Sequence, residues 1–134
     1  MRPEIYGTQD RRLRADTQDL CRRVARDFKP AASVVNLIFV SDQTIQELNR
    51  RFLHRDRPTD VISFNDDEPQ LPGEPRLLGE VYISRGRARA QAREYGVTYE
   101  SELRRYVLHG LLHLLGLTHR QMEPYYRRYL PRDK

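Results

Sequence analysis

The segment VLHGLLHLLGLTHRQM, residues 107–122, constrains the fold of this chain more than any other stretch. Thr98 suits the cap of a helix leading into it, with Glu100 and Glu102 in the first turn. The apolar residues of that helix fall on nearly every side of it: Leu103, Val107, Leu108, Leu111, Leu112, Leu114 and Leu115. A helix that is apolar all round has to be buried, so the pattern predicts a core helix.

Three histidines interrupt this apolar segment with the spacing H-x-x-x-H-x-x-G-x-x-H. His109 and His113 are four residues apart and therefore share a helix face, and Gly116 lets the chain turn so that His119 returns toward them. Three imidazoles at about 2.0–2.1 Å from an ion, with a fourth position open, form a catalytic zinc site. The alternative is a set of core histidines bonded to backbone, but the third histidine favours a metal site with one Zn²⁺ per chain.

Gly110 follows the first histidine, where the zinc proteases keep a glutamate base. Glycine inside a helix costs about 1 kcal/mol relative to alanine, so it indicates that something must come close. Close packing against a sheet and access for a ligand both remain open as reasons. In either case the carboxylate needed for peptide hydrolysis is missing, which disfavours a metalloprotease.

The remaining pattern predicts an α+β fold, an α/β sandwich with a small mixed sheet of about four strands, about five helices and a zincin-like histidine helix. Strands are expected at 34–40, 60–64 and 79–84, and a mobile loop at 65–78. Helices are expected at 10–28, after Ser41 with Ile45, Leu48 and Phe52 on one face, from Ser84 to Tyr95 with a stop at Gly96, and at about 121–130.

The length and composition indicate the number of domains, the cellular compartment and the class of partner to expect. With 134 residues, the chain is expected to form a single domain, 1–134, and it has no apolar run long enough to span a membrane. One cysteine, Cys21, excludes an internal disulfide and favours a reducing compartment, so the cytoplasm is expected. The net charge is +5 and 22 of the 24 basic residues are arginine, which favours a nucleic-acid partner but also fits a codon bias.

Three motifs resemble the YbeY family of rRNA maturation factors: HGLLHLLGLTH, LNRRFLHRDRPTDVISF and GEVYIS. The resemblance implies a zinc-dependent, single-strand-specific endoribonuclease that acts in 16S rRNA 3′-end maturation and ribosome quality control. It implies His109, His113 and His119 as the metal ligands. Single-stranded rRNA is the implied substrate, with a ribosomal subunit or ribosomal proteins as partners.

The sequence departs from the family pattern where many members have an arginine that is thought to assist catalysis. Alignment of the surrounding motif puts Leu53 there, so no catalytic residue is carried over. Arg55 and Arg57 lie in the same loop and are the candidates to replace it as substrate-binding residues. Asp60 and Ser63 match the family motif and are expected beside the metal, where Asp60 either orients a ligand histidine or caps a turn.

RNA carries its own nucleophile, the 2′-hydroxyl, so a metal acting as Lewis acid and arginines on the phosphates would suffice without a carboxylate base. Two other functions remain open at this point. One is metal-dependent hydrolysis of another bond, and the other is a non-catalytic ribosome-assembly factor that binds RNA and holds a structural zinc.

Overall fold

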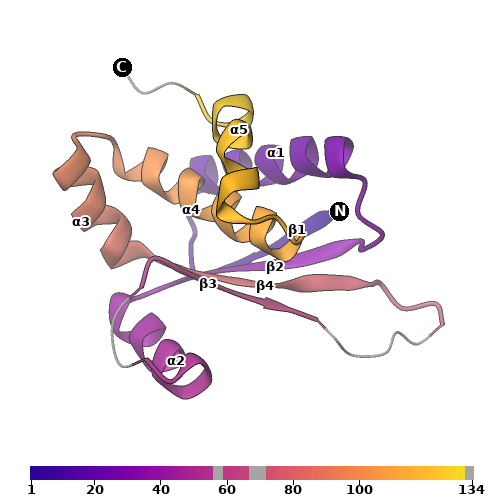
Figure 1. The fold of residues 1–134 in the computed structure, drawn as a ribbon, viewed down its shortest axis with the longest axis horizontal. Helices are drawn as coiled ribbons and strands as arrows, with labels where there is room; N and C mark the ends of the chain where they lie inside the picture. The colour runs from indigo at the N-terminus through magenta and orange to yellow at the C-terminus, as the bar shows by residue number, and fades with distance from the viewer. Residues whose placement is uncertain (56–58, 67–71, 132–134) are drawn as a thin grey trace.

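The computed structural model describes residues 1–55, 59–66 and 72–131, and Figure 1 shows their arrangement. The strands are β1 (Arg2–Tyr6), β2 (Val34–Val40), β3 (Val61–Asn65) and β4 (Leu77–Ser84). The helices are α1 (Arg11–Phe28), α2 (Asp42–Leu53), α3 (Arg85–Tyr95), α4 (Tyr99–Leu114) and α5 (His119–Tyr129). A four-stranded sheet with five helices confirms the predicted α+β class.

The strands form one mixed sheet in the order β1-β2-β4-β3. β1, β2 and β4 run parallel, and β3 pairs antiparallel with β4. Alternate side chains of the two central strands are fully or almost fully buried: Val35, Leu37, Phe39, Val81 and Ile83. Helices α1, α4 and α5 lie over one face of the sheet, whereas α2 lies at one end of the other face (Figure 1).

Helix α4 packs closely on the sheet because it carries a glycine at the point of contact. A Cβ atom at Gly110 would overlap the side chain of Val81 and lie 3.3 Å from Cγ2 of Val61. Gly79 of β4 has the same effect from the sheet side, since a Cβ there would lie 2.8 Å from Cδ2 of Leu114. Close packing is therefore the reason for the glycine after the first histidine, one of the two that the sequence left open.

Helix α5 is attached to α1 by polar contacts near its C-terminus. The Tyr129 hydroxyl donates a hydrogen bond of 2.6 Å to Asp27, and this bond lowers the pKa of the Asp27 carboxyl. The Arg23 guanidinium donates to the backbone carbonyls of Tyr129 and Arg128 at 3.0 and 3.1 Å. Cys21, also on α1, is fully buried as expected, and burial raises the pKa of its thiol to about 12.

The expected caps and most expected bounds are confirmed, but three expectations were wrong or incomplete. β1 was not predicted, because Ile5 is its one fully buried apolar residue and the strand is recognisable only from its parallel pairing with β2. Helix α5 starts at His119 rather than near residue 121. Phe52 is 55% exposed although Ile45, on the same helix, is buried, because its ring contacts that of Phe64 on β3, a strand at the edge of the sheet.

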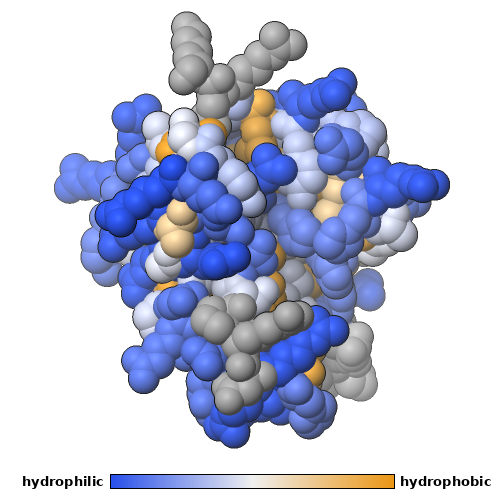
Figure 2. Space-filling view, turned by 60° about the vertical axis from the view of Figure 1, so that its left-hand side comes forward, coloured by the Kyte–Doolittle hydropathy of each residue, from blue (hydrophilic) through white to orange (hydrophobic). Residues whose placement is uncertain are grey.

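The loop expected at 65–78 is shorter in the described residues, since Asn65 ends β3 and Leu77 begins β4, and residues 67–71 lie outside the described part. Figure 2 shows the side of the molecule that carries α3, where hydrophilic residues dominate and hydrophobic ones form small separate patches. None of the helices in the described ranges is both long and apolar enough to cross a membrane.

Gly110→Ala is expected to lower the free energy of unfolding by about 1–3 kcal/mol, because the added methyl group overlaps Val81. In an open helix the same substitution would raise the free energy of unfolding by about 1 kcal/mol. Thermal unfolding followed by circular dichroism measures the change. The double variant with Val81→Ala is the control. Its loss of unfolding free energy should be smaller than the sum of the losses in the two single variants. A Gly110→Ala protein as stable as the parent would contradict the close packing.

Candidate metal centre and adjoining groove

The three histidines of the motif come from two helices that meet at a tight turn. His109 and His113 lie on α4, and His119 is the first residue of α5. The ring centroids of His109 and His119 are 5.1 Å apart, and those of His109 and His113 are 6.4 Å apart. The fold therefore brings the predicted ligands into one neighbourhood.

The turn between the two helices is held by local hydrogen bonds. Gly116 has φ +88°, a conformation that glycine adopts without steric cost, and its N–H donates to the His113 carbonyl at 3.0 Å. Thr118 and Gln121 form a capping box, in which each side chain accepts a hydrogen bond from the backbone N–H of the other. His119 is consequently fixed at the N-terminus of α5.

Three imidazoles are groups that zinc accepts as ligands, and the spacing of His109 and His119 also suits a zinc ion. Two imidazoles on one tetrahedral zinc at about 2.0–2.1 Å have ring centroids roughly 5 Å apart. The His109–His119 pair matches this separation, whereas the exposed ring of His113 lies farther out. Within the described ranges, no three His, Cys, Asp or Glu side chains are close enough to hold an ion as they stand.

A hydrogen bond from α5 orients the His109 ring. Its Nδ1 lies 2.8 Å from the hydroxyl oxygen of Tyr126, and that hydroxyl donates toward Sδ of Met122 at 3.9 Å. Which of the two groups donates in the contact between Nδ1 and the hydroxyl depends on the tautomer of the imidazole. The tautomer with its hydrogen on Nδ1 donates to the tyrosine oxygen and leaves Nε2 unprotonated, which is the form that a metal ligand at Nε2 needs. The Arg105 guanidinium stacks over the Tyr126 ring, 5.1 Å from its centroid, and holds it in place.

The surroundings of His109 favour its neutral form. Burial lowers the pKa of the imidazole, and the nearby Asp60 carboxylate opposes this shift without reversing it. Burial also raises the pKa of the Tyr126 hydroxyl, so the hydroxyl stays protonated. A neutral imidazole next to a neutral phenol is the state in which the hydrogen bond between them orients a ligand.

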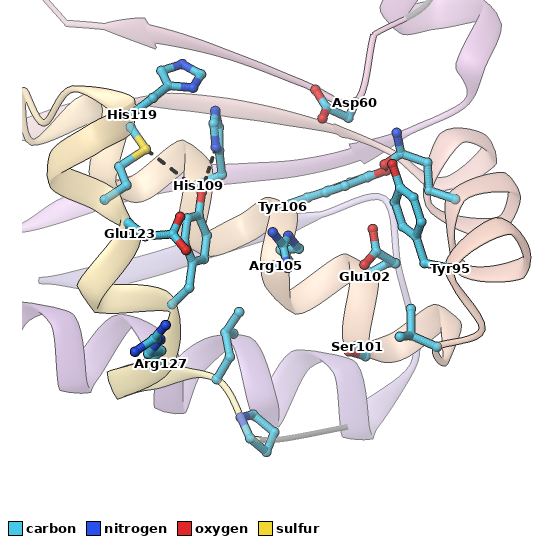
Figure 3. Close-up of a pocket in the computed structure, with 16 residues that line it drawn as sticks. Asp60, Tyr95, Ser101, Glu102, Arg105, Tyr106, His109, His119, Glu123 and Arg127 are labelled. Atoms are coloured by element: carbon cyan, nitrogen blue, oxygen red, sulfur yellow. Dashed lines mark hydrogen bonds between the residues drawn. The ribbon is translucent and has the colours of Figure 1, made fainter. Parts of the chain in front are cut away.

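His109 and His119 line a groove of about 1060 Å³ that runs along α4 between α3 and α5. Figure 3 shows His109 and His119 at one end of it and Tyr95 at the other, with Arg105 between them. Arg127 of α5 adds a second cation to the wall. The groove therefore combines possible metal ligands, arginines and aromatic rings in one continuous surface.

The predicted substrate-binding residues are only partly brought to this groove. Asp60 lines it, and one of its carboxylate oxygens also accepts the N–H of Val61 at 2.8 Å. Asp60 thus caps the start of β3, and within the described ranges it forms no hydrogen bond to a histidine. Arg55 is exposed after α2 and is not among the described residues that line the groove, and Arg57 lies outside the described residues. The Ser63 hydroxyl donates to the Gly110 carbonyl at 3.4 Å and so contacts the histidine helix itself.

Some residues of the site were not found from the sequence. Tyr126 carried no signal, because its contact with His109 depends on how α5 is placed against α4. Asn65 donates from Nδ2 to the Leu114 carbonyl at 2.9 Å and thereby satisfies the end of the histidine helix. Arg105 had an available signal, since it lies four residues before His109 and so shares its helix face.

Comparison with known proteins identifies the family. The sequence model described as Endoribonuclease YbeY matches residues 4–127 of the chain. The chain belongs to the YbeY family of endoribonucleases. This confirms the resemblance drawn from the motifs. The matched region contains the histidine segment and all of the groove lining except Leu130 and Pro131.

Individual YbeY relatives agree. Endoribonuclease YbeY of Halalkalibacterium halodurans is 43% identical over 112 residues, covering 76% of this chain and 70% of that protein. Its counterpart in Lysinibacillus sphaericus is 45% identical over 97 residues, covering 67% of this chain and 60% of that protein. The solution structure of TM1509 from Thermotoga maritima is 30% identical with a TM-score of 0.66, covering 95% of this chain and 85% of that one. The fold is therefore shared with a solved structure over almost the whole chain.

In the metal-free protein, the His109 ring is expected to populate mainly one neutral tautomer, because its Nδ1 is hydrogen-bonded to the Tyr126 hydroxyl. Two-bond proton–nitrogen correlation spectra distinguish the two tautomers. Tyr126→Phe should change the tautomer populations, whereas Tyr125→Phe, a change on the same helix that leaves the hydrogen bond intact, should not. Tautomer populations in Tyr126→Phe equal to those of the unmodified protein would contradict an orienting role for Tyr126.

Proposed function

We propose that this protein is a metal-dependent endoribonuclease that cleaves single-stranded RNA. The observation that carries the proposal is the groove in which His109 and His119 share a continuous surface with Arg105 and Arg127. Such a surface has a site for a cation next to guanidinium groups, each of which can donate two parallel hydrogen bonds to a phosphate. Membership of the YbeY endoribonuclease family supports the same reaction.

The metal in this proposal is one zinc ion per chain, held by His109, His113 and His119. Three neutral imidazoles are a donor set that zinc accepts, with one position left for a substrate or water. The hydrogen bond between His109 and Tyr126 supports the assignment, since ligand histidines almost always engage their second nitrogen in this way. Zinc at such a site supplies Lewis-acid polarisation of a phosphate oxygen and activates water near neutral pH.

The residues of the chain then bind and orient the RNA rather than act as a carboxylate base. Gly110 occupies the position of the protease glutamate, and the side chain of Val81 fills the space that a larger residue would need, so this position supplies no carboxylate. RNA supplies a 2′-hydroxyl next to each phosphate, and Arg105 and Arg127 are placed to offset the charge that develops on the phosphate. Arg55 and Arg57 are proposed as further phosphate contacts from the loop after α2.

The biological role proposed is maturation of the 16S rRNA 3′ end and ribosome quality control in the cytoplasm. The family resemblance supports the rRNA substrate and a ribosomal subunit or ribosomal proteins as partners. The net charge of +5, carried almost entirely by arginine, agrees with an RNA partner. Residues 1–134 are proposed to act as one endoribonuclease domain.

One observation favours a second candidate, a ribosome-assembly factor that binds RNA without cutting it. Leu53, at the position of the family arginine, is 46% exposed at the end of α2. An exposed leucine offers no charge to a phosphate. In that case the zinc would be structural, and its removal would unfold the helices that it joins.

Cleavage of a single-stranded RNA that spans the 3′ end of small-subunit rRNA tests the two functions. The unmodified, metal-loaded protein is expected to cut it, whereas chelator-treated protein and His113→Ala should not, although both retain their circular dichroism. His54→Ala, a change of an exposed histidine outside the three-histidine segment, is the matched control and should cut normally. RNA binding without cleavage in every sample would favour the assembly factor. Cleavage of peptide instead of RNA would indicate another metal-dependent hydrolase.

Metal occupancy should fall as the pH falls below about 6.5, because protons compete with zinc for the imidazole nitrogens. Burial lowers the pKa of His109, so this histidine stays neutral to a lower pH than an exposed one. The pH at which zinc begins to dissociate is therefore not set by His109 alone. Zinc bound after equilibrium dialysis at a series of pH values measures the effect. Occupancy unchanged down to roughly pH 4 would rule out ligation by three histidines.

A further inference from the structure

The end of the groove farthest from the histidines carries an exposed aromatic ring. Tyr95 is the last residue of α3, directly before the left-handed Gly96 that ends the helix, and it is 61% exposed. Its ring nevertheless belongs to the wall of the groove, opposite His109 and His119 (Figure 3). An apolar ring that lines a polar groove and remains open to solvent is available for stacking.

Three residues of α4 lie along the length of the groove. Arg105 lies one helical turn before His109, and Ser101 lies one turn before Arg105. His109 and Ser101 are eight residues apart on the helix, which corresponds to roughly 12 Å. This exceeds the roughly 3.4 Å between successive nucleotides of a stacked strand, so the groove is long enough for more than one nucleotide.

The Tyr95 end is better suited to a base than to a phosphate. Glu102 lies beside Tyr95 in the groove wall and is 5% exposed, so its carboxylate disfavours an anion there (Figure 3). The Tyr106 hydroxyl donates to the side-chain oxygen of Gln91, and this fixes the carboxamide of Gln91 at the same end with its N–H groups as donors. A ring for stacking next to fixed hydrogen-bond donors matches the face and the edge of a nucleobase.

We propose that Tyr95 is a stacking platform for one base of the bound single-stranded RNA. The platform is separated from the cleavage centre by the phosphate-binding Arg105. Its role is to hold the strand in register, so Tyr95 is a binding residue and takes no part in the chemical step. The inference rests on the proposed function, because the histidine end of the groove is taken as the cleavage centre.

The test uses short uridine-rich single-stranded RNAs that carry one 2-aminopurine, moved from position to position. 2-Aminopurine fluorescence is quenched when the base stacks on a ring. Mixing in a stopped-flow instrument reports binding before the RNA is cut. For the unmodified protein with its metal, quenching is expected at one position of the strand. Tyr95→Ala should lose that quenching and bind the RNA roughly tenfold more weakly, whereas Tyr95→Phe should keep both.

Tyr6→Ala is the matched control, because Tyr6 is also exposed, at 52%, but lies on β1 at the far edge of the sheet. It should bind and quench like the unmodified protein. Replacing the 2-aminopurine by an abasic site should weaken binding to the unmodified protein and leave binding to Tyr95→Ala unchanged. Tyr95→Ala that binds and quenches like Tyr6→Ala would overturn the platform.

The same samples separate this inference from the proposed function. RNA cut by the unmodified protein, with no dependence of binding on Tyr95, would reject the platform and keep the endoribonuclease. Quenching that depends on Tyr95 without any cleavage would keep the platform and reject the endoribonuclease. Absence of RNA binding by the unmodified protein would reject both.

Discussion

The contact between α4 and the sheet is the interaction on which the other features of this protein depend. Gly110 allows the helix to lie directly on Val81, and the Ser63 and Asn65 side chains then reach the helix carbonyls at Gly110 and Leu114. These contacts fix the rotation of α4 about its axis. The rotation in turn decides that the histidine next to Gly110 faces the groove. One missing side chain thus explains both the close contact in the core and the absence of a carboxylate beside the candidate metal ligands.

A second helix, anchored independently, completes the site. The hydrogen bond from Tyr129 to Asp27 and the one from Arg23 to the Tyr129 carbonyl hold the end of α5 on α1, and the capping box at Thr118 holds its start. Between these two attachments, Tyr126 and His119 are presented to α4. The proposed metal site therefore depends on two separate layers of the fold. A substitution on α1 that loosens α5 should disturb the candidate ligands without touching them, since Tyr126 and His119, which approach His109, lie on α5.

Elements with a strong hydrophobic period and a polar cap could be predicted from the sequence. β2 has the expected bounds, and Ser41, Ser84 and Thr98 are the N-caps of their helices. Strand β1 could not be predicted, because its short, mostly polar sequence becomes a strand only through pairing with β2. The groove was not predictable for the same reason. Its wall combines residues of α3, α4 and α5, and nothing local in the chain specifies how three helices pack against each other.

The sequence by itself determined the buried helix, the three candidate metal ligands, the absence of a protease base and the YbeY family. The first three follow from spacing along one segment, where helix geometry converts residue number into direction, and the family follows from the resemblance of three motifs. Only the tertiary structure decided that Gly110 serves packing, that Tyr126 orients His109, and that Arg105 and Tyr95 lie along one groove with the histidines. Those properties depend on side chains that meet across different elements. Such contacts are set by the burial of apolar surface over the whole chain, which no local pattern records.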